Sequence, residues 1–221
     1  LEPLPIYLDS HATTPVDPRV LDVMLPFFTE HFGNASSRNH PFGWKAGKAV
    51  ERAREQVAAL MGVRFRDVVF TSGATESNNL AIKGVAARAP QHRRHIVTVS
   101  TEHRSVLDPC LALERDGFRV TRLGVDAEGR LDLQRMSEAI ADDTLLVSVM
   151  SGNNEIGVLQ PVTEIARLAR ARGVIFHCDA VQSAGLVPMN AGEAGIDLVS
   201  LSAHKIYGPK GIGALYVRSR G

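Results

Sequence analysis

The stretch IDLVSLSAHKIYGPKGIGALYV, residues 196–217, decides the fold class of this chain. It opens with a run of mostly apolar residues, passes through a loop rich in glycine and proline, and ends in a second apolar run. Successive apolar positions, rather than alternating ones, are typical of strands in a sheet that is covered on both faces. The loop raises a question of function, because His204 and Lys205 directly follow a strand that should be buried.

The same strand pattern recurs along the chain, with helical patterns between the strands. The predicted strands are 68–71, 96–99, 120–125, 145–149, 174–177, 198–201 and 213–217, and the predicted intervening helices are 76–88, 105–115, 131–140 and 162–172. Two further helices, 18–32 and 42–61, precede the sheet, and Gly62 is a suitable C-cap for the second. The sequence therefore predicts an α/β fold with a mostly parallel central sheet between two layers of helices.

Composition narrows the class of protein. The chain has 221 residues, 44% hydrophobic and 22% charged, with a net charge of +1. This balance indicates neither a nucleic-acid nor a membrane partner. No run approaches the ~20 apolar residues that span a bilayer, and residues 1–10 do not resemble a secretion signal, so we expect a soluble cytoplasmic protein. Because the chain lacks an initiator methionine and stops just after a predicted strand, we expect a fragment of a longer protein.

Polar residues follow five of the predicted strands, at the edge where α/β sheets bind ligands. These segments are Thr71–Glu76, Thr101–His103, Asn153–Glu155, Asp179–Gln182 and Ser202–Lys205. In the first, TSGATESNN leads into a helix whose free backbone N–H groups suit a phosphate. The alternative is an ordinary turn capped by Ser72 or Thr75.

Lys205 and Asp179 together indicate a particular cofactor. An amine at a buried strand end loses solvation, which lowers its pKa and favours Schiff-base chemistry. Pyridoxal phosphate needs such a lysine for its aldehyde and a carboxylate for its pyridine nitrogen. Alternatively, the lysine reaches solvent or pairs with a carboxylate, and the aspartate caps a turn.

The remaining polar side chains fit the same cofactor. Thr75, Ser202 and His204 are candidates for the phosphate, and His103 for stacking on the ring, although a single histidine is more often structural. A metal site is the competing interpretation: His177 and Asp179 share one face of a strand, but no second pair at ligand spacing supports them.

Seven motifs resemble those of one known family. They are YLDSHATTPVDPRV, FGNASSRNHPFGW, VFTSGATESNNLAIKG, STEHRSVLDPC, NNEIGVLQP, FHCDAVQSAG and SAHKIYGPKGIGALYVR. From about Ile6 to Arg218 the chain is similar to cysteine desulfurases of the NifS/IscS type, which are fold type I pyridoxal-phosphate enzymes of the class V aminotransferase superfamily. The resemblance implies the large domain of a PLP transferase at residues 17–221, preceded by an arm at 1–16, with a small C-terminal domain missing.

The resemblance also implies the roles of individual residues. Lys205 would form the Schiff base with the cofactor and move protons, while His103 would stack on the ring and share in proton transfer. Asp179 would pair with the pyridine nitrogen and Gln182 would contact the phenolic oxygen. The phosphate would be held by Ala74 (backbone), Thr75, Ser202 and His204; Asn154 would lie near the cofactor and the substrate carboxylate, and Asn34 and Ser36 in a loop facing the substrate.

The chain departs from the family at three places: Ser10-His11, Ser151-Gly152 and Ala203, where glycine is usual. It also lacks the C-terminal cysteine that accepts sulfur and the arginine that binds the substrate carboxylate. We expect the two cysteines present, Cys110 and Cys178, to be buried and unreactive.

The resemblance implies that the parent protein removes sulfur from L-cysteine and releases L-alanine. The sulfur would serve iron–sulfur cluster assembly or tRNA thiolation through an acceptor or scaffold protein, and the enzyme would be a homodimer. Two alternatives stay open: another class V enzyme such as a selenocysteine lyase, and a truncated module that binds the cofactor without turnover.

Overall fold

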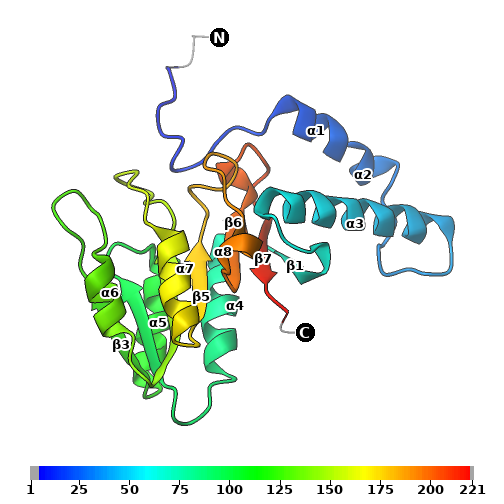
Figure 1. The fold of residues 1–221 in the computed structure, drawn as a ribbon. Helices are drawn as coiled ribbons and strands as arrows, with labels where there is room; N and C mark the ends of the chain where they lie inside the picture. Colours follow the sequence, from blue (N-terminus) through cyan, green and yellow to red (C-terminus); the bar gives the residue numbers. More distant parts are fainter. Residues whose placement is uncertain (1–4, 220–221) are drawn as a thin grey trace.

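The computed structural model describes residues 5–219 and has one central sheet between two layers of helices (Figure 1). The strands are β1 (Val68–Thr71), β2 (His95–Val99), β3 (Arg119–Leu123), β4 (Thr144–Met150), β5 (Ile175–Asp179), β6 (Leu198–Ser202) and β7 (Gly213–Val217). The α-helices are α1 (Pro18–Met24), α2 (Pro26–Thr29), α3 (Pro41–Met61), α4 (Ala74–Ala86), α5 (Arg104–Arg115), α6 (Leu133–Ala139), α7 (Val162–Ala171) and α8 (Ala191–Ala194). The predicted α/β class is confirmed.

The sheet has seven strands in the order β1-β7-β6-β5-β4-β2-β3. The neighbours from β6 through β5, β4 and β2 to β3 pair in parallel, whereas β7 is antiparallel to both β1 and β6. The prediction of a mostly parallel sheet therefore holds, with one reversed strand. Because β7 follows β6 after a loop of only ten residues, 203–212, the chain must turn back on itself there rather than cross over.

Both faces of the sheet are buried, which explains the continuous apolar strands. On one face, Val147, Phe176 and Val199 pack with residues of α6, α7 and α8 in the larger core cluster. On the other, Ile96 and Leu146 pack with residues of α4 and α5. Neighbouring residues of the central strands thus pack on opposite faces of the sheet, as the two-residue period of a strand requires.

The predicted helix 18–32 is wrong in one respect, because the structure has two short helices, α1 and α2, in its place. The second begins at Pro26, whose ring nitrogen has no hydrogen to donate to the preceding turn. The prediction for α3 is confirmed: it ends at Gly62, which adopts the left-handed conformation with φ 65°. In Figure 1, α1 to α3 extend to one side of the sheet.

Both cysteines are fully buried, as the sequence predicts. Burial raises the pKa of the Cys110 thiol to about 12 and raises that of Cys178 as well. Since the thiolate is the reactive form, both thiols should be inert in the native chain at pH 8. Alkylation followed by peptide mapping should label neither cysteine before denaturation and both after it. Rapid native labelling of either peptide would contradict this burial.

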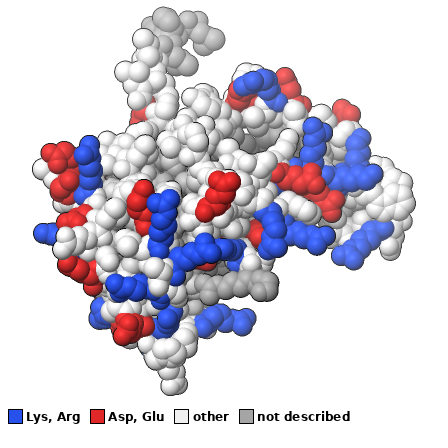
Figure 2. Space-filling view, viewed as in Figure 1, with Lys and Arg blue, Asp and Glu red and all other residues white. Residues whose placement is uncertain are grey.

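The surface carries both signs of charge. Figure 2 shows basic and acidic side chains interspersed over the visible face, in line with the net charge of +1. Among residues 5–219, no helix combines the length and the apolar character that a bilayer crossing requires.

Candidate active site

The carboxyl ends of β5 and β6 open into a cavity of about 840 Å³. Nine residues predicted to bind the cofactor line it: Ala74, Thr75, His103, Asn154, Asp179, Gln182, Ser202, His204 and Lys205. The two residues predicted to face the substrate, Asn34 and Ser36, do not line this cavity. They lie in the loop between α2 and α3, where Asn34 Oδ1 accepts a hydrogen bond from Ser36 N at 2.8 Å, so their role stays a prediction.

Lys205 enters the cavity because a short 3-10 turn, Ala203–Lys205, follows β6 directly. Its Nζ donates hydrogen bonds to the backbone oxygens of His11 and Ala12, the latter at 2.9 Å. Partial burial lowers the pKa of Lys205 below its ordinary value, while the charges of Asp9 and Asp179 oppose this shift. The amine is therefore more easily deprotonated than a surface lysine, which suits a nucleophile or a base. Lys210 is exposed at the rim of the same cavity.

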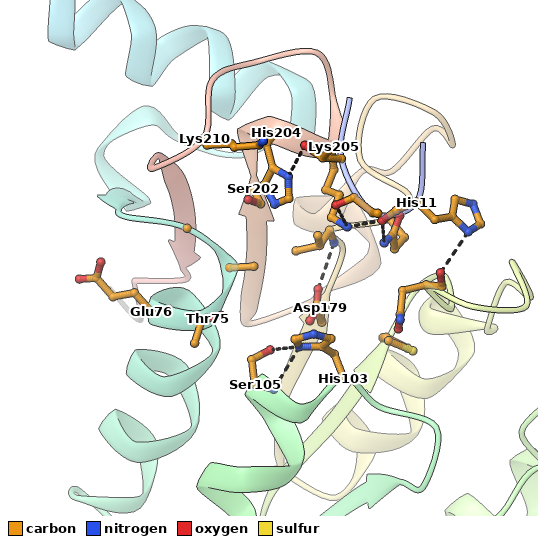
Figure 3. A pocket seen from close by; sticks show the side chains of 18 of the residues that line it. His11, Thr75, Glu76, His103, Ser105, Asp179, Ser202, His204, Lys205 and Lys210 are labelled. Atoms are coloured by element: carbon orange, nitrogen blue, oxygen red, sulfur yellow. Dashed lines mark hydrogen bonds between the residues drawn. The ribbon is translucent and has the colours of Figure 1, made fainter. Parts of the chain in front are cut away.

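The N-terminal arm forms one wall of the cavity, which sequence reasoning missed. Asp9, His11, Ala12 and Thr13 line it, although they are about 190 residues away from Lys205 in sequence. The Nδ1–H of His11 donates to the backbone oxygen of Asn154 at 3.1 Å, as Figure 3 shows. Such contacts leave no periodic pattern in the sequence. They are made largely by backbone oxygens, which every residue type has, so the residue types of the arm do not reveal them.

The same arm also holds the 3-10 turn that carries Lys205 in place through hydrogen bonds. Thr14 donates from both its backbone N and its hydroxyl to the backbone oxygen of His204, at 2.9 and 3.0 Å. Its Oγ1 also accepts from the N–H of Tyr207, the one non-glycine residue of the described chain with positive φ, 61°. A left-handed tyrosine is strained, so the surrounding contacts must hold it in place.

Asp179 lies deeper in the cavity, below Lys205 in the view of Figure 3. Its Oδ1 accepts from the N–H of Val181 at 3.1 Å, and its Oδ2 accepts from Nδ2 of Asn78 at 2.7 Å. Burial raises the pKa of Asp179, and these two hydrogen bonds lower it in part. Both of these donors are neutral groups, so the carboxylate is not already neutralised through them and can pair with a cation of a ligand.

His103 is held at the start of α5, where its Nδ1 accepts from the N–H of Ser105 at 3.1 Å and pairs with Ser105 Oγ at 2.8 Å. Because Nδ1 accepts from a backbone N–H, the ring proton of the neutral imidazole must lie on Nε2. Figure 3 shows the ring close to Asp179 on the floor of the cavity. His103 thus presents a fixed flat ring with a single donor.

The N-terminus of α4 lies across the cavity from Asp179 and is capped by no side chain. Its N-cap is Gly73, φ 152°, so the alternative in which Ser72 or Thr75 caps the turn is wrong. Ser72 instead donates from N and Oγ to Glu76, at 2.6 and 2.7 Å. Free N–H groups at the start of a helix attract anions, and the side chains of Thr75, Ser202 and His204 line the cavity beside them.

A polar layer lies beneath the cavity on the α4 side of the sheet. His177 accepts or donates at both ring nitrogens, with Ser148 at 2.8 Å and Ser200 at 2.9 Å. Complete burial lowers the pKa of His177 to about 3, so the ring is neutral. Both nitrogens being occupied, His177 is a structural bridge across β4, β5 and β6 rather than a ligand for a metal.

Glu102 is a second buried carboxyl, next to His103 in sequence and 5% exposed. Its Oε1 accepts from the N–H of Met150 at 2.6 Å, and Oε2 has no hydrogen-bond partner among residues 5–219. Burial, with a contribution from Asp179, raises the pKa of Glu102 well above its usual range, so we assign the neutral acid. It joins the loop after β2 to the end of β4.

This burial makes a testable prediction about pH. Above the ordinary carboxyl pKa of 4.5, the unfolded state releases a proton that folded Glu102 retains, so the wild type loses stability as pH rises. Glu102→Gln does not titrate and should become more stable than wild type by about 1.4 kcal/mol per pH unit, until the folded pKa is reached. Urea unfolding at pH 5, 6, 7 and 8 measures this difference. A difference independent of pH would show that Glu102 is ionised in the fold.

The remaining predicted residues, Gln182 and Asn154, line the cavity beside the N-terminal arm. Gln182 Nε2 donates to the backbone oxygen of His11 at 3.0 Å, and Asn154 offers its backbone oxygen to the same histidine. Sequence reasoning did not assign two further residues: Ser105, which lines the cavity, and Asn78, which is buried behind it and contacts Asp179 and Ser105. Asn78 lies within the motif VFTSGATESNNLAIKG. Its sequence gives one hint only, an asparagine near the start of a helix, and such a poor helix former is often a surface residue.

Comparison with known proteins identifies the family. The family model described as aminotransferase class-V matches residues 6–220. The chain is 59% identical over 217 residues to a cysteine desulfurase IscS of Anaeromyxobacter sp. (strain Fw109-5), covering 98% of this chain and 54% of that protein. It is 58% identical to the mitochondrial cysteine desulfurase of Drosophila melanogaster, covering 98% of this chain and 47% of that protein.

Two solved structures share the fold closely. A NifS-like protein superposes with a TM-score of 0.95 at 40% identity, over 99% of this chain and 60% of that one. A structure described as SspA in complex with cysteine superposes with a TM-score of 0.93 at 44% identity, over 96% of this chain and 61% of that one. The chain spans about half the length of the curated relatives that it matches. With nearly all of its sequence matched by that family model, this chain belongs to the class V aminotransferase family.

Proposed function

We propose that this chain is the pyridoxal-phosphate-binding large domain of a cysteine desulfurase, which removes sulfur from L-cysteine and releases L-alanine. The observation that carries the proposal is the convergence of Lys205, Asp179 and the uncapped start of α4 on one cavity. The relatives named as cysteine desulfurases, and the neighbour described in complex with cysteine, support the choice of substrate.

The residues present fit this cofactor at each of its functional groups. The free N–H groups of α4, with Thr75, Ser202 and His204, would hold the phosphate. Asp179 would face the pyridine nitrogen, and His103 would lie against the ring. Lys205 would hold the aldehyde carbon, after exchanging its contacts with the backbone oxygens of His11 and Ala12. Asn154 and Gln182, which also line the cavity, would contact the cofactor as well.

When bound, pyridoxal phosphate supplies an aldehyde that condenses with amines and a ring that accepts electrons from the substrate. The chain supplies the proton chemistry. Lys205, with its lowered pKa, would take a proton from substrate and return it, and His103 would donate from Nε2. Asp179, ionised opposite a cation, would keep the ring nitrogen protonated.

The sulfur acceptor must come from outside this chain. Cys110 and Cys178 are both fully buried and neither lines the cavity. We therefore propose that a cysteine in a C-terminal domain of the full-length protein accepts the sulfur as a persulfide, for delivery to iron–sulfur cluster assembly or tRNA thiolation. We also propose a homodimer, with residues 17–221 as the large domain.

The test compares the full-length protein with the 221-residue chain. Given L-cysteine, a reductant and the cofactor, the full-length protein should release alanine and sulfide in equal amounts, and the chain alone should bind the cofactor without turnover. A parallel assay with selenocysteine as substrate distinguishes a cysteine desulfurase from a selenocysteine lyase, which would release alanine from selenocysteine only. A full-length protein that holds the cofactor yet forms no alanine from cysteine would overturn the proposal.

A further inference from the structure

The buried side-chain amide of Asn78 connects Asp179 with His103 beneath the cavity. Asn78 lies on α4 with no exposed surface. Its Nδ2 donates to Oδ2 of Asp179 at 2.7 Å and to Oγ of Ser105 at 2.8 Å. An amide nitrogen has two hydrogens, so both are used. Because carboxylate oxygens only accept, the orientation of this amide is determined by its contact with Asp179.

Ser105 extends the connection to the histidine. Its Oγ accepts from Asn78, so its own hydrogen is free to point at Nδ1 of His103, 2.8 Å away. Asn78 therefore donates one hydrogen bond to Asp179 and one to Ser105, and Ser105 in turn donates to His103. All four side chains are held by α4, α5 and β5, three elements of the rigid core.

The chemistry of this position favours an uncharged donor. A cation at 2.7 Å would neutralise Asp179 and compete with the pyridine nitrogen for it. A second carboxylate there would repel Asp179, and the pair would share one proton. An amide stabilises the buried negative charge without cancelling it.

We propose that Asn78 is a positioning residue that orients Asp179 and, through Ser105, His103 for the cofactor. The proposal rests on the function proposed above, because only a cofactor gives the two groups a common task. It adds that a single side chain, touching neither substrate nor cofactor, sets the direction of the carboxylate and, through Ser105 Oγ, the hydroxyl contact on Nδ1 of the imidazole.

Few titratable groups act on Asp179, so the contribution of Asn78 can be isolated. His103 and Lys205 lower the pKa of Asp179, and buried Glu102 interacts with it as a neighbouring acid. Burial raises the pKa of Asp179, and the hydrogen bond from the Asn78 amide is the contact that lowers this pKa most. None of the other groups receives a hydrogen bond from Asn78.

The test uses three variants and needs no cofactor at first. Asn78→Ala should raise the midpoint of the Asp179 carboxyl titration, followed by carbon NMR. It should also shift the Nδ1 signal of His103 in nitrogen NMR, because Ser105 Oγ loses the donor that orients it, while the Nε2–H tautomer stays, since the N–H of Ser105 still donates to Nδ1. Ser105→Ala should alter the His103 signals and leave the Asp179 titration unchanged. Asn79→Ala is the matched control, since that neighbouring amide donates only to the backbone oxygen of Thr75, at 3.0 Å, within α4.

Cofactor binding completes the test. Loss of a hydrogen bond to a charged group predicts that Asn78→Ala binds pyridoxal phosphate about tenfold to a hundredfold more weakly, with Asn79→Ala unchanged. Should Asn78→Ala fold poorly, Asn78→Asp keeps the shape, and its binding should weaken as pH rises and the two carboxyls repel. Unchanged Asp179 and His103 signals in Asn78→Ala would overturn the inference. If wild type binds no cofactor while the NMR changes occur, the proposed function fails and the connection stands.

Discussion

Replacing Lys205 by alanine is expected to abolish covalent attachment of pyridoxal phosphate and to reduce turnover of the full-length protein by at least about a thousandfold. The reason is chemical rather than structural. Lys205 is the amine at the centre of the cavity, and its contacts in the fold are two backbone oxygens of the N-terminal arm. The absorption band of the bound cofactor and the rate of alanine release measure the two effects.

Lys210→Ala is the matched control for this substitution. Lys210 lies on the same loop and lines the same cavity, but it is exposed at the rim. We expect it to retain the covalent attachment and, at most, to weaken noncovalent binding of the phosphate. Equal loss of the absorption band in both variants would sink the assignment of Lys205.

Replacing Asp179 by asparagine is expected to have opposite effects on stability and on function. Burial raises the pKa of Asp179 in the folded chain, so ionisation in the unfolded state lowers the stability of the cofactor-free wild type as pH rises above the usual carboxyl range. Asparagine removes that cost and should stabilise the cofactor-free protein, increasingly toward the folded pKa. Asparagine has one oxygen for the two donors that Asp179 accepts from, the N–H of Val181 and Nδ2 of Asn78, so the loss of one of these hydrogen bonds offsets part of this gain at every pH.

The same substitution should weaken cofactor binding by about thirtyfold or more, because it removes one partner of a buried charge pair. Turnover should fall by about a hundredfold to a thousandfold, the scale of losing one preorganised electrostatic contact. Urea unfolding without cofactor, together with binding and rate measurements, separates the two effects. A stability difference from wild type that does not change with pH would contradict the first expectation, and normal cofactor binding would contradict the second.

Much of this site was predictable because it lies at strand ends. Asp179 and Lys205 follow buried apolar runs, and the topology of a parallel sheet brings such ends to one edge. The helix α3 was predictable to within one residue from its apolar pattern and Gly62. These features depend on local periodicity and on one general rule of topology.

The rest depends on contacts between residues distant in sequence, which leave no local pattern. The arm at residues 9–14 reads as an irregular terminus, yet its backbone oxygens bind Lys205 and Gln182. Asn78 occupies a helix position where an asparagine usually faces solvent, and only the tertiary fold shows that it faces Asp179. The break in the predicted helix 18–32 could have been predicted from the sequence, since Pro26 disfavours a continuous helix.

The most direct measurement is to incubate the purified chain with pyridoxal phosphate, reduce it with borohydride and map the labelled peptide. The cavity geometry predicts a visible absorption band before reduction and a single label on Lys205 after it. A label on Lys210 or on surface lysines alone, or a folded chain that acquires neither band nor label, would contradict the claim that this cavity holds the cofactor through Lys205.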